Sequence, residues 1–273
     1  MAAQDRVGDP SEPIAVYQRR VAASLERVWE NVLDWEHLPW LHHDSFCGVE
    51  LEESGAWGWR ARVELPPREQ PSRLTIEVRL DRASREYHTR TLAGPGAGTD
   101  IVTRLATPDA AHTDVAVSFH VPGLPESARK PLGEGYVRLY TQLWDEDEAM
   151  MMRRDALLAG RTPAAARPGA RDPLALGAAA ALRTRLPLRV ELAGDAFRIV
   201  EHEGRLLAHS LVCPHLGGPL EQATLEHGAV VCPWHGYRFD CETGLGPTGQ
   251  RCRMAVTARV LVDAGGQAQL VVA

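Results

Sequence analysis

Two short segments near the end of the chain carry residue types that bind metals. Cys213 and His215 are separated by one proline, and Cys232 and His235 by a proline and a tryptophan. Zinc fingers place a cysteine pair before a histidine pair, whereas each segment here offers one sulfur and one nitrogen. This order favours a 2Fe-2S cluster in which one iron takes both thiolates and the other takes both imidazoles. A zinc site is the competing interpretation, and chance placement of the four residues on two surface turns is the third.

Glycines beside these segments agree with a cluster. Gly217 and Gly218 follow the first segment, and Gly236 follows the second. Glycine lets the backbone approach closely, so that its N–H groups can reach the inorganic sulfides.

The motifs CPHLGG, VCPWHGYRFD and ETG follow one another at the spacing of Rieske domains, which this part of the chain resembles. The Trp-His-Gly form of the second motif is similar to that of Rieske oxygenases and their ferredoxins. Leu216 and Trp234 occupy the places where cytochrome bc-type members carry extra cysteines, so no disulfide is expected. The resemblance implies a 2Fe-2S cluster with four ligands: Cys213, His215, Cys232 and His235.

A second candidate site lies near the start of the chain. Asp34, His37 and His42 surround Pro39, which cannot sit inside a regular helix and therefore predicts a helix end and a bend. Across this bend His37 and His42 can converge, and two converging neutral imidazoles suit an iron site. Capping or packing at the helix end is the alternative role for both histidines.

One acidic residue of a later helix points toward the core. The apolar stripe of residues 133–158 predicts a long helix, and Asp147 is in phase with that stripe, at four residues from both Leu143 and Met151. Asp145 and Glu148 are expected to point to water. A buried carboxylate is costly unless a charge or a metal compensates it, so Asp147 is a candidate ligand, with a buried ion pair as the alternative.

The length, composition and net charge limit the classes of protein to which the chain can belong. The 273 residues, 44% of them apolar, suit two domains. The formal net charge of −6 disfavours nucleic acid as the main partner. No apolar run reaches the length of a membrane span, and the N-terminal residues lack the apolar core of a signal peptide. Three of the five cysteines lie outside the cluster motifs. Reduced thiols in a cytoplasm are the simplest account, so we expect a cytoplasmic protein without a membrane partner.

Alternation of apolar and charged residues predicts an antiparallel sheet with one face in water. The clearest strands are residues 14–23, 57–65, 73–80 and 114–121, and Ser24 is a plausible N-cap for a helix at 25–33. The helix at 133–158 would cover the apolar face. The expected organisation is a flexible tail (1–13), a domain with the candidate iron site and a substrate cavity (14–158), a linker (159–184) and a domain of short strands around the cluster loops (185–273).

This order of elements resembles the helix-grip fold, which START-like lipid binders share with the catalytic domains of Rieske oxygenases. The fold class implied is α+β: an antiparallel sheet with a long C-terminal helix, followed by an all-β Rieske domain. The spacing of Asp34, His37 and His42 is similar to the iron motif of those oxygenases. The resemblance implies that His37, His42 and Asp147 bind a mononuclear Fe(II), with Glu146 as the alternative carboxylate. It also implies that Asp34 links His37 to His235 of a neighbouring subunit.

The function implied is that of a Rieske-type non-heme iron oxygenase. Such an enzyme uses dioxygen, and electrons from an external reductase or ferredoxin, to hydroxylate or oxidatively demethylate an apolar or aromatic small molecule. The family places its Rieske domain first, whereas here it comes last, and the expected catalytic domain is short; a trimer, the family's assembly, is the expected homo-oligomer. The alternative is a non-enzymatic electron carrier or redox sensor fused to a START-like ligand-binding domain.

Overall fold

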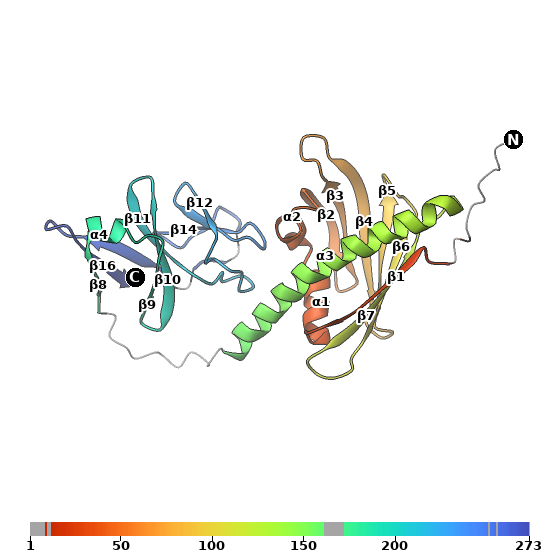
Figure 1. The fold of residues 1–273 in the computed structure, drawn as a ribbon, viewed down its shortest axis with the longest axis horizontal. Coiled ribbons are helices and arrows are strands. Elements are labelled where there is room, and N and C mark those ends of the chain that lie inside the picture. Colours follow the sequence, from red (N-terminus) through yellow and green to blue (C-terminus); the bar gives the residue numbers. More distant parts are fainter. Residues whose placement is uncertain (1–8, 10–11, 161–171, 251, 255, 273) are drawn as a thin grey trace. The chain divides into compact units, whose positions relative to one another are not determined.

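The alternating strands form the antiparallel sheet that the sequence predicts. The computed structural model describes residues 9, 12–160, 172–250, 252–254 and 256–272, so most of the predicted tail and part of the predicted linker lie outside the described residues. The chain divides into two units, Met1–Asp155 and Ala156–Ala273. The α+β fold class is confirmed: an antiparallel sheet with a long helix is followed along the chain by a unit built mainly of strands (Figure 1).

The first unit contains, in its described part, a seven-stranded sheet in the order β1-β7-β6-β5-β4-β3-β2. Every neighbouring pair is antiparallel. The strands are β1 (Ala15–Val21), β2 (Gly48–Gly55), β3 (Gly58–Leu65), β4 (Ser72–Asp81), β5 (Glu86–Ala93), β6 (Asp100–Ala106) and β7 (Thr113–His120).

Helical segments connect β1 to β2. Helix α1 (Leu25–Leu33) begins at Ser24, whose Oγ accepts a hydrogen bond from the Arg27 N–H as an N-cap does. A 3-10 turn, η1 (Trp35–His37), and the short helix α2 (Leu38–Leu41) follow. Pro39 lies in the first turn of α2, where its missing N–H removes no helical hydrogen bond. The expected break at Pro39 is therefore a change from one short helix to another.

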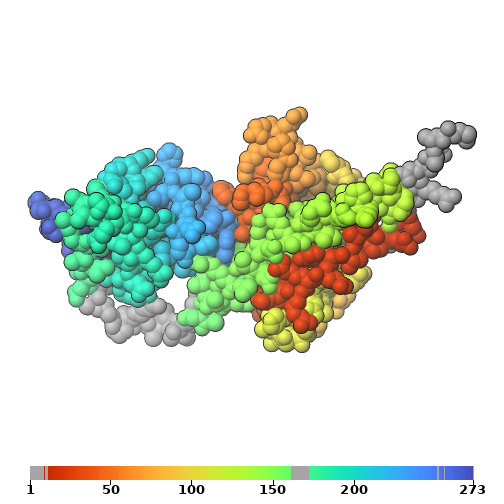
Figure 2. Space-filling model, in the orientation of Figure 1, coloured from red at the N-terminus to blue at the C-terminus, as the bar shows by residue number. Residues whose placement is uncertain are grey.

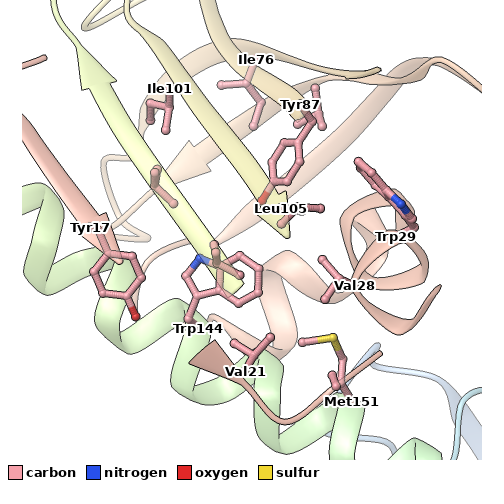
Figure 3. Packing of buried hydrophobic residues seen from close by; sticks show 14 of the residues in the cluster. Tyr17, Val21, Val28, Trp29, Ile76, Tyr87, Ile101, Leu105, Trp144 and Met151 are labelled. Atoms are coloured by element: carbon pink, nitrogen blue, oxygen red, sulfur yellow. The ribbon is translucent and has the colours of Figure 1, made fainter. Parts of the chain in front are cut away.

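The long helix α3 (Glu126–Ala159) closes the first unit. The sequence predicts a start at residue 133, but the helix begins at Glu126. Pro131 and the polar residues before it belong to its first turns. Figure 2 shows α3 and β1 side by side on the surface of this unit, and Gly133 of α3 packs directly against the backbone of Ile14. The core lies between the helices and the sheet. Figure 3 shows Trp144 and Met151 of α3 there, with Val28 of α1 and Ile76 of the sheet.

The contact between β1 and α3 corrects one expectation. Glu148 does not point to water: its carboxylate binds the Arg19 guanidinium and accepts a hydrogen bond of 2.6 Å from the Ala22 backbone N–H. Asp145 pairs with the same guanidinium from a more exposed position. Strand β1 covers this side of α3, which helical phase alone does not reveal.

The second unit is built from two smaller sheets. In the described residues these sheets have the orders β8-β16-β15-β11-β10-β9 and β12-β13-β14. Its elements are β8 (Leu174–Ala178), α4 (Ala179–Arg183), β9 (Leu188–Leu192), β10 (Asp195–His202), β11 (Arg205–Ser210), β12 (Thr224–Glu226), β13 (Ala229–Val231), β14 (Arg238–Asp240), β15 (Ala258–Val262) and β16 (Gln267–Val272).

This unit has its own apolar core, which includes Phe197, Ile199 and Leu270. Residues 174–183, which the sequence places in the linker, form β8 and α4 here, and β8 pairs with β16. Within the described part of the chain, no helix has the length and apolar character needed to cross a membrane.

Candidate metal centres

Three residues from separate elements converge in the first unit. His37 ends η1, His42 caps α2 and Asp147 lies on α3. The Asp147 Oδ1 atom lies 3.1 Å from Nε2 of His42 and 3.6 Å from Nε2 of His37. One ligand atom from each residue lies within 4.8 Å of the others, and all three residues are buried. A proline-containing bend and a long helix together therefore place two imidazoles and one carboxylate in one spot.

A further polar side chain lies next to each of these three residues. Asp34 Oδ2 lies 3.5 Å from His37 Nδ1, and Glu146 Oε2 lies 2.6 Å from His42 Nδ1. The short contact with Glu146 selects the tautomer that presents His42 Nε2 to the centre. The Asn31 side chain donates a hydrogen bond of 2.9 Å to Asp147 Oδ1. Glu146 thus meets the ring nitrogen of His42 opposite the one near Asp147, and Asp147 is the carboxylate that lies between the imidazoles.

The electrostatics of this group favour a cation. Burial alone would lower the pKa of His42, but hydrogen bonds and charge from Asp147 and Glu146 outweigh it and raise that pKa. Burial likewise would raise the pKa of Asp147, yet hydrogen bonding and charge from His42 hold it below its ordinary value. Carboxylates therefore outnumber cationic groups here, which is the condition that a bound metal ion relieves.

A cavity of about 120 Å³ opens beside the three residues. Apolar side chains from β3, β4 and α3 form much of its wall, and β5 adds Tyr87 and Thr89. Asn31, Tyr87 and Thr89 were not predicted from the sequence as site residues. The alternation of Tyr87 and Thr89 with His88 and Arg90 was the signal that could have found this strand.

The Cys-His segments of the second unit form two similar turns. In the first, the Gly217 N–H donates to the Cys213 carbonyl at 3.0 Å. In the second, the Gly236 N–H donates to the Cys232 carbonyl at 2.9 Å. The ring centroids of His215 and His235 are 4.5 Å apart. The Cys213 thiol hydrogen-bonds the Cys232 sulfur, which lowers the pKa of Cys232. The turns therefore bring two sulfurs and two imidazoles to one end of the unit.

Glycine is required at these turns for conformation and for space. Gly217 and Gly236 have φ values of +86° and +66°, in the left-handed region that favours glycine. A Cβ atom on Gly218 would lie 2.6 Å from the Cys232 sulfur, so only glycine leaves room beside that ligand. Two thiols, two imidazoles and a close backbone fit a 2Fe-2S cluster bound by two sulfurs and two nitrogens.

Comparisons with known proteins match the second unit to a known family of domains. Residues 172–253 match the family model described as Rieske [2Fe-2S] domain. Apoptosis-inducing factor 3 of Mus musculus and that of Homo sapiens are each 42% identical to this chain over 55 residues. That match covers 20% of this chain and 9% of each relative.

Solved structures similar to part of the chain include three with named functions or families. An aromatase/cyclase from Streptomyces sp. R1128 is 22% identical with a TM-score of 0.45, over 54% of this chain and 98% of its own. A START superfamily protein from Mycobacterium smegmatis is 18% identical with a TM-score of 0.41, over 50% and 96%. Norcoclaurine synthase from Thalictrum flavum is 16% identical with a TM-score of 0.39, over 54% and 87%.

The ligand turns, the glycines beside them and the family match all concern the same residues. Residues 172–253 form a Rieske [2Fe-2S] domain, which follows an N-terminal unit of one antiparallel sheet and a long helix.

Proposed function

We propose that this protein is a Rieske-type non-heme iron oxygenase that oxidises a small molecule with dioxygen. The observation that carries the proposal is the convergence of His37, His42 and Asp147 beside a cavity. Two imidazoles and one carboxylate are the facial set that binds Fe(II) and leaves open positions for dioxygen. A bound Fe(II) would supply the dioxygen chemistry that protein side chains lack.

The side chains around the proposed iron ligands orient them. Glu146 fixes the tautomer of His42, Asp34 lies beside Nδ1 of His37, and Asn31 holds the Asp147 carboxylate. The cavity walls bind the substrate next to the ligands and exclude bulk water. We further propose that Asp34 makes the hydrogen-bonded connection to His235 of a neighbouring subunit, in a trimer.

The Rieske domain stores and passes single electrons in this proposal. Cys213, His215, Cys232 and His235 hold its cluster. An external reductase or a ferredoxin supplies the electrons, and the oxidised product is a hydroxylated or demethylated small molecule.

Iron and sulfide analysis tests the proposal. We expect about three irons and two sulfides per chain, because the cluster accounts for two irons and the triad for one. Asp147→Ala should lose one iron and keep the visible spectrum of the cluster, whereas Asp145→Asn, a change at an exposed neighbour, should keep all three. His37→Ala should abolish turnover with the cluster spectrum intact. Two irons in fully loaded wild-type protein would instead support an electron carrier or redox sensor fused to a ligand-binding domain.

A further inference from the structure

The cavity beside His37, His42 and Asp147 is small for a ligand site. Its volume is about 120 Å³, whereas sites for drug-sized ligands measure roughly 300–1,000 Å³. An apolar cavity of about 150 Å³ in another protein holds benzene. The wall includes two indoles, Trp59 from β3 and Trp144 from α3, both almost fully buried. The cavity is therefore no larger than a single ring needs, and a fused pair of rings exceeds it.

The charge of the cavity wall is negative. Asp34 and Asp147 belong to the wall, and no lysine or arginine does within the described residues. Arg154 lies near Asp34, but its guanidinium donates two hydrogen bonds of 2.8 Å to Glu30. Glu146, which contacts His42, adds a third carboxylate to those of Asp34 and Asp147. A bound divalent cation would therefore still leave one negative charge in excess. An anionic ligand would lose its hydration there and meet an excess of negative charge.

The wall also carries hydroxyl groups that a ligand can use. Tyr140 and Tyr87 both line the cavity, and burial first, then the neighbouring Tyr87, raises the pKa of Tyr140 well above its ordinary value. Asp147 belongs to the same wall. Among the described residues, no hydrogen bond satisfies the Tyr140 hydroxyl. A hydroxyl in the cavity wall can donate to or accept from a hydroxyl or amino group of a ligand.

From the cavity's size, its charge and the Tyr140 hydroxyl, we infer that the site takes an uncharged single-ring molecule with a hydroxyl or amino group and rejects carboxylates. The inference rests on the proposed function, in which this cavity is the substrate site. Tyr140 is then the residue that orients the polar group of the substrate, while Trp59 and Trp144 limit its width.

Isothermal titration calorimetry of the full-length, cluster-loaded protein at pH 7 tests this with four probes. Phenol should bind more tightly than toluene, because only phenol can pair with Tyr140. Benzoate, which is ionised at this pH, should bind about 100-fold more weakly than phenol. The two-ring 1-naphthol should bind more weakly than phenol. Benzoate or 1-naphthol binding as tightly as phenol would overturn the charge or the size argument.

A single substitution tests the role of the hydroxyl. Tyr140→Phe keeps the ring, so toluene binding should persist, while the preference for phenol over toluene should fall about fivefold. Tyr136→Phe removes a hydroxyl from the same helix at a residue outside the cavity wall. This control should leave the affinities for phenol and toluene unchanged. An unchanged preference in Tyr140→Phe would overturn the assignment. Binding needs neither dioxygen nor a third iron, so protein that binds phenol selectively but holds two irons would retain this inference and lose the oxygenase.

Discussion

Asp147 shows how a buried carboxylate is accommodated. Its Oδ1 atom lies within 3.6 Å of three nitrogens, from Asn31, His37 and His42. Asn31 can only donate through its Nδ2 atom, whereas each imidazole can bind either a proton or a metal ion. The same three groups therefore stabilise the carboxylate without a metal and orient it for one.

Glu146 should tune the affinity of the proposed iron site without binding the iron. In Glu146→Gln the acceptor oxygen near His42 Nδ1 remains but its charge is lost. We expect the affinity for Fe(II) to fall about 10- to 100-fold, as for other groups that orient metal-binding histidines. An anaerobic Fe(II) titration measures it. Asp145→Asn, which changes an exposed acid on the same helix, is the control, and equal affinity in both variants would contradict this role.

The packing of α3 on β1 depends on a glycine. A Cβ atom at Gly133 would meet the Ile14 carbonyl oxygen at 2.6 Å, so Gly133→Ala should push the helix from the strand. The expected loss is about 1–2 kcal/mol of unfolding free energy, despite the better helix propensity of alanine. In Gly135→Ala the new Cβ would meet only the Arg138 guanidinium, at 4.0 Å. The unfolding free energy of that variant should rise by about 0.5–1 kcal/mol. Urea denaturation compares them, and equal effects would refute the packing argument.

A buried acid on β4 should make the sheet sensitive to acid. Glu77 pairs with Arg60 of the neighbouring strand β3, its register partner. Hydrogen bonds from Arg79 and Arg60 lower the pKa of Glu77 below its ordinary 4.5. A lowered folded-state pKa stabilises the protein above the unfolded value, and this stabilisation is lost as the pH falls through the folded value.

Glu77→Gln should therefore cost about 1 kcal/mol at pH 7, and its difference from wild type should shrink below pH 4.5. Urea unfolding across this pH range measures it. Glu50→Gln affects a more exposed cross-strand pair with Arg62 and should change stability by only a few tenths of a kcal/mol. A difference between Glu77→Gln and wild type that stays constant from pH 7 to pH 3.5 would contradict the assignment.

Regular elements were predictable from the sequence where one periodicity dominates. β3, β4 and β7 alternate cleanly between apolar and polar residues, and α1 has both a cap and an apolar stripe. β2 and β5 were not predicted individually because charged or polar side chains interrupt their alternation, as in GVELEESG. The burial of Asp147 follows from helical phase. The pairing of Glu146 with His42, and of Glu148 with β1, depends on which element packs against each side of α3, and periodicity carries no such information.

At the scale of the whole molecule, the two units have separate apolar cores. Phe119 and Trp144 belong to the first core and Phe197 and Leu270 to the second, and the cluster ligands all lie in the second unit. Loss of the cluster should therefore weaken one unit and leave the other intact, since a bound metal centre contributes to the folding free energy of the domain that holds it.

Calorimetry of Cys232→Ser tests this independence. We expect wild-type protein to unfold in two thermal transitions, one for each unit. Cys232→Ser, which lacks a cluster ligand, should lower the midpoint temperature of the second unit's transition only. Gly133→Ala should lower the midpoint of the first unit's transition only. A single transition that shifts as a whole in both variants would show that the units unfold together.

Four consecutive acids on α3 have three different attachments: Asp145 and Glu148 bind Arg19, Glu146 binds His42, and Asp147 lies between His37 and His42. Each residue along a helix turns the side chain by about 100°. Deleting one residue between Tyr136 and Trp144 would rotate this whole acidic quartet and break every attachment at once. This stretch of the gene should therefore tolerate point substitutions far better than insertions or deletions.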